Sequence, residues 1–160
     1  MLDWEGHLEV LREMKRAGSI RYIGITTSHG RRHDELLQAM KKADFDFVQF
    51  TYGLHDRDAE SRLLPLAVER RMGVIANRPF DGGDLFGRVR GKPLPDWAAE
   101  IDCANWAQVF LKFVVSHPAV TCAIPATSNP AHMLENMGAN FGRLPDAALR
   151  RRMAQHFDGI

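Results

Sequence analysis

The segment "LLPLAVERRMGVIANRPF", residues 63–80, decides the fold class because it places a helical pattern directly before a strand pattern. The apolar residues between Leu63 and Val68 recur at helical spacing. The run that begins at Gly73 is rich in β-branched and aliphatic residues and ends in a turn that contains Pro79. The segment therefore predicts a helix followed by a strand.

The same order of elements recurs along the chain. The other predicted strands are "IRYIGIT" (residues 20–26), "FDFVQFTYG" (45–53) and "VTCAIPATS" (120–128). Helical patterns at residues 8–14 and 36–40 precede the first two of these strands. The last strand follows the glycine-rich loop "DGGDLFGRVRGKPLP" (81–95) and the predicted helix "ANWAQVFLKFVVSHP" (104–118). Alternation of this kind is typical of parallel strands joined by right-handed crossovers, in an open sheet or a closed barrel. Further helices are expected from Pro130 and near residues 144–153.

The number of strands limits which of these architectures fits. A (β/α)8 barrel normally needs eight strands and about 250 residues, whereas this chain of 160 residues supplies four predicted strands. We therefore expect an α/β fold equivalent to half of a TIM (β/α)8 barrel, with four parallel strands and outer helices. Parallel sheets are usually covered on both faces, and barrel-type units place all their helices on one. The other face must be covered by something else.

Composition sets limits on the class of protein. With 45% hydrophobic residues, the chain is long enough for one core, so residues 1–160 are expected to form a single domain. The net charge is +1, from 21 basic and 20 acidic residues, which argues against nucleic acid or a membrane as the main partner. The basic run at residues 150–152 is interpreted as a solvated helix face. No apolar stretch is long enough to span a bilayer and no signal peptide is apparent, so a cytoplasmic location is expected.

The cysteines and histidines do not predict a metal site. Cys103 and Cys122 are far apart in the sequence and are expected to be free thiols. Cys122 lies inside an apolar strand and is interpreted as a small buried hydrophobic residue. His29 and His33 stand four positions apart, as metal ligands can, but "HGRRH" is better interpreted as the polar start of a helix.

The segment "IPATSNPAHMLEN", residues 124–136, predicts a strand that stops abruptly before a helix. Pro130 suits the first helical position, and Asn129 or Ser128 can cap the free backbone N–H groups. A helix N-terminus just beyond a strand commonly binds phosphate, although many strand-to-helix turns have this pattern without doing so. From these residues alone, both interpretations stay open.

Five segments together resemble the second half of the aldo-keto reductases. They are "GSIRYIGIT", "FVQFTYG", "LLPLAVERRMGVIANRPFDGGDLF", "FVVSHPAVTCAIPATSNPAHMLENM" and "LPDAALRRRM", and they occur in the order and at the spacing found in that family. The resemblance implies an eight-stranded barrel that binds extended NADP(H) across the C-terminal ends of its strands and reduces aldehydes and ketones. It also implies that the four strands correspond to the fifth through eighth of that barrel.

The resemblance assigns three groups of cofactor-binding residues. Thr26, Thr27 and Gln49 correspond to residues that hydrogen-bond the nicotinamide carboxamide, and Asn77 stands where many members stack a tyrosine on the ring. The loop after the third strand corresponds to a strap over the pyrophosphate, in which Arg78 is the best-placed cation, whereas Arg88 and Arg90 are expected to be exposed. The assigned strap residues are Arg78, Pro79, Phe80, Gly82, Gly83 and Leu85.

The adenosine end of the cofactor is assigned to the last strand and the helix after it. Its residues are Ile124, Pro125, Thr127, His132, Glu135 and Asn136. The family grips the 2′-phosphate of NADP with a lysine and an arginine, and this chain has Ala126 and His132 in those places. Because a histidine is mostly neutral near pH 7, the expected preference for NADP is weakened and NAD is an alternative.

Catalytic residues are not predicted in this chain. The family's tetrad of Asp, Tyr, Lys and His comes from the first half of the barrel, and Tyr22 and Tyr52 both lie in the strand segments already assigned. Three hypotheses follow: an NAD(P)-linked oxidoreductase half completed by a complementary N-terminal half-barrel, a non-catalytic half-barrel that pairs with itself and binds nucleotide, and an interaction protein that exposes the former barrel interior to a protein partner.

Overall fold

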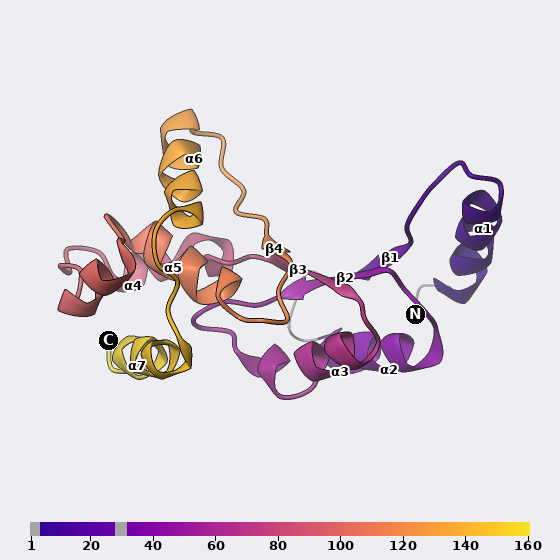
Figure 1. The fold of residues 1–160 in the computed structure, drawn as a ribbon, viewed down its shortest axis with the longest axis horizontal. Coiled ribbons are helices and arrows are strands. Elements are labelled where there is room, and N and C mark those ends of the chain that lie inside the picture. The colour runs from indigo at the N-terminus through magenta and orange to yellow at the C-terminus, as the bar shows by residue number, and fades with distance from the viewer. Residues whose placement is uncertain (1–3, 28–31) are drawn as a thin grey trace.

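The computed structural model describes residues 4–27 and 32–160, and its centre is one parallel sheet (Figure 1). The strands are β1 (Gly24–Thr26), β2 (Phe47–Thr51), β3 (Gly73–Asn77) and β4 (Cys122–Ala123), in the spatial order β1-β2-β3-β4. Each is shorter than its predicted run. β3, for example, ends before Arg78, whose φ of 49° leaves the extended region. The expected arrangement of four parallel strands with outer helices is confirmed.

The helices follow the predicted alternation. They are α1 (Trp4–Arg16), α2 (His33–Lys42), α3 (Leu63–Glu69), α4 (Asp84–Arg88), α5 (Trp106–Val115), α6 (Pro130–Met137) and α7 (Ala147–Asp158). Short 3-10 turns are η2 (Asp58–Glu60), η3 (Asp81–Gly83), η4 (Asp96–Ile101) and η5 (Gly138–Asn140). α4 lies inside the segment predicted as a glycine-rich loop. No helix in the described ranges is long and apolar enough to cross a membrane.

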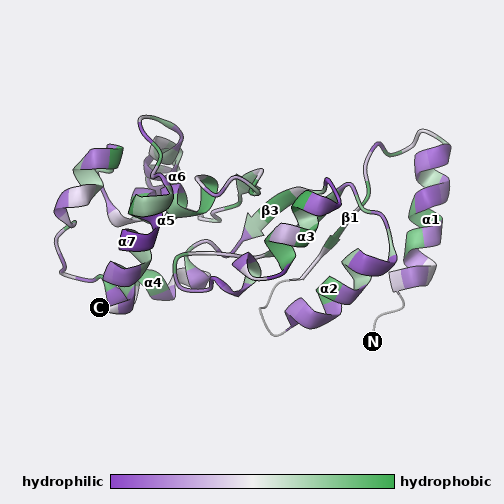
Figure 2. Ribbon diagram, turned by 60° about the horizontal axis from the view of Figure 1, so that its bottom comes forward, coloured by the Kyte–Doolittle hydropathy of each residue, from purple (hydrophilic) through white to green (hydrophobic). Residues whose placement is uncertain are grey.

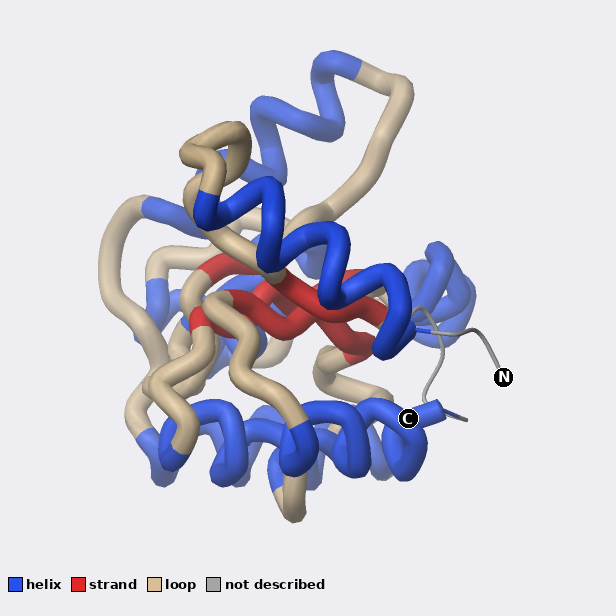
Figure 3. The backbone as a smooth tube through the Cα atoms, turned by 90° about the vertical axis from the view of Figure 1, so that its right-hand side faces the viewer, coloured by secondary structure: helices blue, strands red, loops and turns tan. Residues whose placement is uncertain are grey.

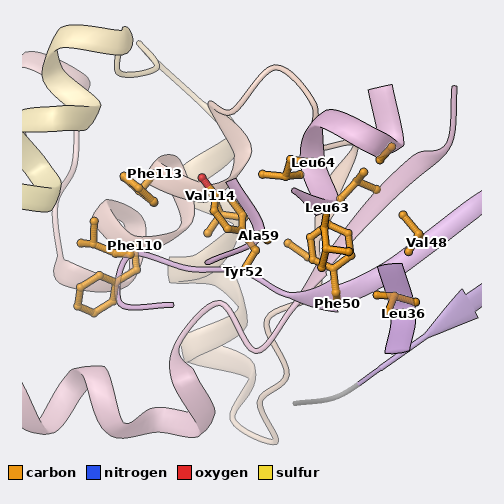
Figure 4. Close-up of a cluster of buried hydrophobic side chains, with 14 of the residues drawn as sticks. Leu36, Val48, Phe50, Tyr52, Ala59, Leu63, Leu64, Phe110, Phe113 and Val114 are labelled. Carbon is orange, nitrogen blue, oxygen red and sulfur yellow. The ribbon is translucent and has the colours of Figure 1, made fainter. Parts of the chain in front are cut away.

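The core lies between the sheet and the helices on one of its faces. Figure 1 shows α2 and α3 along one side of the strands, and Figure 3 shows the strands above a row of helices. Val48 and Phe50 of β2 are fully buried there and belong to one hydrophobic cluster with Leu36, Leu63 and Leu64 (Figure 4). Figure 2 accordingly shows β3 and α3 as mainly hydrophobic and α1 as largely hydrophilic.

The opposite face of the sheet is open. Strand register places Thr26, Gln49, Ile75 and Cys122 in one row across the four strands. Because side chains alternate between faces, this row points away from the row that contains Val48. Thr26 and Cys122 are exposed and the middle two residues are half-buried. The face that would line the interior of a complete barrel is therefore uncovered by the residues described.

The interpretation of Cys122 as a buried residue is wrong. It lies on this open face of β4 and is exposed, whereas Cys103 is 8% exposed. Burial raises the pKa of the Cys103 thiol to about 11. Both thiols are free, as expected. The two cysteines therefore differ sharply in accessibility.

The interpretation of residues 150–152 as a solvated face is wrong for Arg150. Its side chain is 11% exposed and its guanidinium donates to the carbonyl of Phe113, to Ser116 Oγ and to Tyr52 Oη. It also lies 4.2 Å from the centre of the Phe113 ring. Arg150 thus joins α7 to α5 and to the segment after β2.

The expectation of exposure also fails for Arg88, which is half-buried. Its guanidinium carbon lies 4.4 Å from the centre of the Phe157 ring, and Nη1 is 3.0 Å from His55 Nδ1. Arg90 is exposed, as expected. Arg88 therefore helps to hold α4 against α7.

Candidate functional site

The C-terminal ends of three strands are joined by one buried amide. Asn77 Nδ2 donates to the carbonyl of Thr27 at 2.8 Å, and the hydroxyl of Thr51 donates to Asn77 Oδ1 at 3.0 Å. Asn77 and Thr51 are buried. Hydrogen bonds in such a protected place fix the geometry of the strand ends. Asn77 therefore acts here as a clamp across β1, β2 and β3.

The segment after β3 has an unusual backbone. Arg78 and Asp81 have φ values of 49° and 51°, and Gly82 and Gly83 have values of 69° and 107°. Positive φ is costly for residues with a Cβ atom and is enriched at active and ligand-binding sites. A Cβ atom on Gly82 would lie 2.7 Å from Arg78 Nη2, so the guanidinium packs directly over the glycine backbone. This strap, residues 78–83, therefore places a cation directly against a glycine backbone.

The turn from β4 to α6 satisfies its backbone as the sequence predicted. Asn129 is the N-cap and its Oδ1 accepts from Ala131 N at 3.0 Å, while Pro130 occupies the first turn. Thr127 Oγ1 accepts from Asn129 N at 3.1 Å, which leaves the hydroxyl proton free to be donated. This end of α6 can therefore present a hydroxyl donor beside the positive end of the helix dipole.

A cavity of about 850 Å³ lies between the strap, β4 and α6. Its size matches the 300–1,000 Å³ typical of cofactor sites. It brings together two of the three predicted groups, the strap and the adenosine end. The predicted residues that line it are Asn77, Arg78, Pro79, Phe80, Gly82, Gly83, Ile124, Thr127, His132, Glu135 and Asn136.

The remaining predicted residues lie elsewhere. Thr26 and Thr27 line a smaller hollow of about 400 Å³ beside α1 and α2. Gln49 is half-buried on the open face of the sheet, and Leu85 is buried in the core. Pro125 is half-buried next to the cavity residues Ile124 and Ala126 but does not line the cavity. The predicted nicotinamide residues other than Asn77 are thus separate from the main cavity.

Three cavity residues had not been predicted as cofactor-binding: Phe86, Ala107 and Ala126, the last of which stands in place of the family's lysine. Phe86 of α4 is partly exposed and lies 5.0 Å from the Phe80 ring, and Ala107 lies in the first turn of α5. Phe86 also packs edge-on against Phe110. The only sequence signal for Phe86 was an aromatic residue inside a glycine-rich loop. Together, Phe80 and Phe86 give the cavity an aromatic wall.

The charges around the cavity are sparse. Arg78 supplies the one fixed cation among the lining residues, His132 a titratable group and Glu135 a carboxylate. All three are exposed. The arrangement suits a ligand with a small anionic group and a hydroxyl-bearing or aromatic part, since one guanidinium, the Thr127 hydroxyl and an aromatic wall line the same cavity.

Neither tyrosine is placed as a proton donor. The hydroxyl of Tyr52 donates to Glu60 Oε1 and accepts from Arg150 at 2.6 Å. Burial raises the pKa of Tyr52 far above its ordinary value. Tyr22 is 60% exposed and packs edge-on against Phe47. Tyr52 is thus a buried structural group, and neither residue lines the cavity.

The described residues do not form a metal centre. They contain no group of three or more His, Cys, Asp or Glu side chains that could hold a metal ion. His29 of the proposed histidine pair lies outside the described residues. His33 begins α2, as "HGRRH" predicted, and is buried with Nε2 unpaired and its ring edge-on to Phe50.

Comparison with known proteins gives consistent results. The model of the aldo/keto reductase family matches residues 3–152. Pyridoxine 4-dehydrogenase of Escherichia coli is 30% identical over 145 residues, which cover 91% of this chain and 48% of that protein. The NADH-specific methylglyoxal reductase of the same organism is 30% identical over 89 residues, which cover 56% of this chain and 26% of that protein.

A solved structure shares the fold. The apo form of aldo-keto reductase AKR11C1 from Bacillus halodurans superposes with a TM-score of 0.73 at 19% identity, over 97% of this chain and 57% of that one. The chain spans about half the length of this structure and of pyridoxine 4-dehydrogenase. With the family model matching nearly its whole length, the chain belongs to the aldo/keto reductase family.

Proposed function

We propose that this chain provides the nucleotide-binding half of an NAD(P)H-linked oxidoreductase that reduces aldehydes or ketones. The observation that carries the proposal is the cavity that unites the strap, β4 and the N-terminus of α6. Arg78 suits a pyrophosphate, and the lack of side chains at Gly82 and Gly83 lets such a group approach the backbone closely. Thr127 and His132 suit an adenosine phosphate at the start of α6, as in other helix N-terminal phosphate sites.

The preference between the two nicotinamide cofactors is proposed to be weak. His132 supplies no fixed charge and Ala126 supplies none at all, so a 2′-phosphate gains little over a free 2′-hydroxyl. Glu135 lines the same cavity and would repel a phosphate placed near it. The name of the E. coli NADH-specific methylglyoxal reductase is in keeping with use of NADH by a relative.

His132→Arg is expected to shift binding toward NADPH by about two- to fivefold relative to NADH, since an exposed ion pair contributes about 0.5–1 kcal/mol. Fluorescence titration of the chain with each reduced cofactor measures the ratio. Leu134→Arg is the matched control, because it adds the same charge to α6 at an exposed residue that does not line the cavity. Equal shifts in both variants, or no shift in either, would contradict the adenosine-phosphate assignment.

A second candidate function, a self-associating half-barrel without catalysis, is favoured by the open face. Thr26 and Cys122 are exposed on a parallel sheet whose described edges, β1 and β4, each pair on one side only. Both features call for a partner that covers the face and extends the sheet. In this alternative, a second copy of the chain fills this role.

The thiol of Cys122 provides a direct test of assembly. If two chains close over the open face, we expect reaction of Cys122 with a bulky disulfide reagent to slow as the protein concentration rises, in step with the dimer fraction measured by light scattering. Cys103 is the internal control, because burial and its raised pKa keep it unreactive while the fold is intact. A monomer at micromolar concentration, with Cys122 equally reactive throughout and no binding of dyes for exposed apolar surface, would exclude self-association.

A further inference from the structure

α6 is held to the rest of the molecule mainly at its C-terminal end. Residues 131–135 are all exposed, and Asn136 is the buried residue of this helix. Figure 1 shows α6 projecting away from the sheet. Yet α6 carries His132, Glu135 and Asn136 on the wall of the cavity. The shape of the cavity therefore depends on contacts made after residue 134.

Gln108 on α5 makes the first of these contacts. Its Nε2 donates to the carbonyl of Glu135 at 3.0 Å, and its Oε1 accepts from Ala104 N at 2.8 Å. The side chain is buried, and α5 itself is fixed in the core by Val109 and Phe110, both fully buried. A buried carboxamide with donor and acceptor both engaged holds its partners in a defined geometry. Gln108 thus connects a rigid helix to the last turn of α6.

Gly138 shows how closely the two segments approach. A Cβ atom at this position would lie 2.3 Å from Gln108 Nε2 and 3.1 Å from its Cδ. The backbone of Gly138, with φ −56° and ψ −25°, is ordinary helical backbone that alanine also adopts. A methyl group at this position would therefore force the Gln108 carboxamide to move, although alanine could adopt the backbone conformation.

Lys112, one helical turn beyond Gln108, makes the second attachment. Its ammonium is fully buried and donates to the carbonyls of Ile101 at 2.6 Å, Phe141 at 2.6 Å and Arg143 at 3.0 Å. The three bonds use every proton of the ammonium. Two of the carbonyls, those of Phe141 and Arg143, belong to the segment that follows α6 and η5. Lys112 therefore fixes that segment to α5, a few residues after the contact that Gln108 makes with Glu135.

We infer that Gln108 and Lys112 are positioning residues that hold α6 in place and thereby set the affinity of the cavity for a nucleotide. Neither side chain lines the cavity, so each acts only through the helix. The part of this inference that concerns nucleotide affinity rests on the proposed function. The part that concerns the position of α6 does not.

Gln108→Leu tests the inference with little change in volume. We expect amide hydrogen exchange in residues 130–140 to become about fivefold faster, as loss of the hydrogen bond to Glu135, worth about 1 kcal/mol, predicts, while β2, β3 and α5 exchange as before. We also expect the dissociation constant for ADP, measured by calorimetry, to rise by up to about fivefold, the full factor applying where α6 is mostly displaced in the free variant. Gln155→Leu, at an exposed glutamine of α7, is the matched control and should change neither quantity.

Gly138→Ala provides a second variant that keeps Gln108. The added methyl group should displace the Gln108 carboxamide and reproduce the faster exchange in residues 130–140. In a Gln108→Ala background the same substitution should add no further acceleration, because the clashing atoms are gone.

The outcomes separate the inference from the proposed function. Unchanged exchange in residues 130–140 of Gln108→Leu would overturn the inference, as would equal acceleration across β2, β3 and α5. An identical effect of Gly138→Ala in both backgrounds would also overturn it. If the unmodified chain binds neither ADP nor a reduced nicotinamide cofactor, the proposed function fails, and the exchange measurements alone decide the role of Gln108.

Discussion

Lys112→Met is expected to lower the free energy of unfolding by roughly 3–5 kcal/mol, because it leaves three inward-facing carbonyls without their donor at about 1–3 kcal/mol each, partly offset by water. The affected carbonyls belong to Ile101, Phe141 and Arg143. Methionine nearly matches the length of the lysine side chain, so the substitution creates little empty space. The decrease in the free energy of unfolding therefore measures the lost hydrogen bonds. Urea unfolding followed by circular dichroism measures the change.

Lys41→Met is the matched control for this prediction. Lys41 lies in the last turn of α2 and is exposed, so its replacement should change the free energy of unfolding by less than about 0.5 kcal/mol. If the two variants unfold at the same urea concentration, Lys112 does not contribute to stability through its three carbonyl partners. The inference that Lys112 fixes the segment after α6 to α5 would then be wrong.

The repeated units could be predicted because their signals are local. The helical spacing of residues 63–68 and the strand that begins at Gly73 lie side by side in the sequence, and the structure forms both. The capping of α6 could be predicted for the same reason, since Asn129 and Pro130 act on the backbone within two residues. Patterns of this kind need no information about distant segments.

The polar groups that organise the site could not be predicted in this way. Gln108 and Lys112 interrupt an apolar helix, and their partners on the α6 side lie 27 to 31 positions away. The partner Tyr52 lies 98 positions from Arg150, which is why a basic run suggested a solvated face. The pattern of residues within a helix does not predict which distant carbonyl or hydroxyl group will form a hydrogen bond with a side chain.

The exposure of Cys122 has a different cause. Its strand is apolar on both faces in sequence, as expected for a parallel sheet buried on both sides. The residues described cover only one face, so an apolar sequence and an exposed cysteine occur together. Gln49 lies on the same open face. This position separates the predicted nicotinamide residue from the cavity that the strap and α6 form.

Catalysis by the 160-residue chain on its own is expected to be undetectable, because no described residue that lines the cavity is an acidic group positioned to protonate a carbonyl oxygen. Hydride transfer to a carbonyl develops negative charge on oxygen, and loss of a single group that stabilises such charge commonly costs about 10²–10³ in rate. Tyr52 cannot supply the proton, since its hydroxyl is buried between Glu60 and Arg150 and its pKa is strongly raised. Consumption of NADPH and NADH with aromatic and aliphatic aldehydes should therefore equal a no-enzyme control.

Activity is expected to appear when a complementary N-terminal half-barrel is supplied, for example the first half of pyridoxine 4-dehydrogenase co-expressed with this chain. A rate at least about 10³-fold above the control is expected, because a general acid and the charged groups around it then face the open side of the sheet. The control combines Tyr22→Phe with Tyr52→Phe in this chain and should leave that rate measurable, since neither tyrosine lines the cavity. Turnover by the lone chain that the paired substitution abolishes would mean that this half carries its own proton donor. The proposal that the catalytic groups come from a complementary half-barrel would then be wrong.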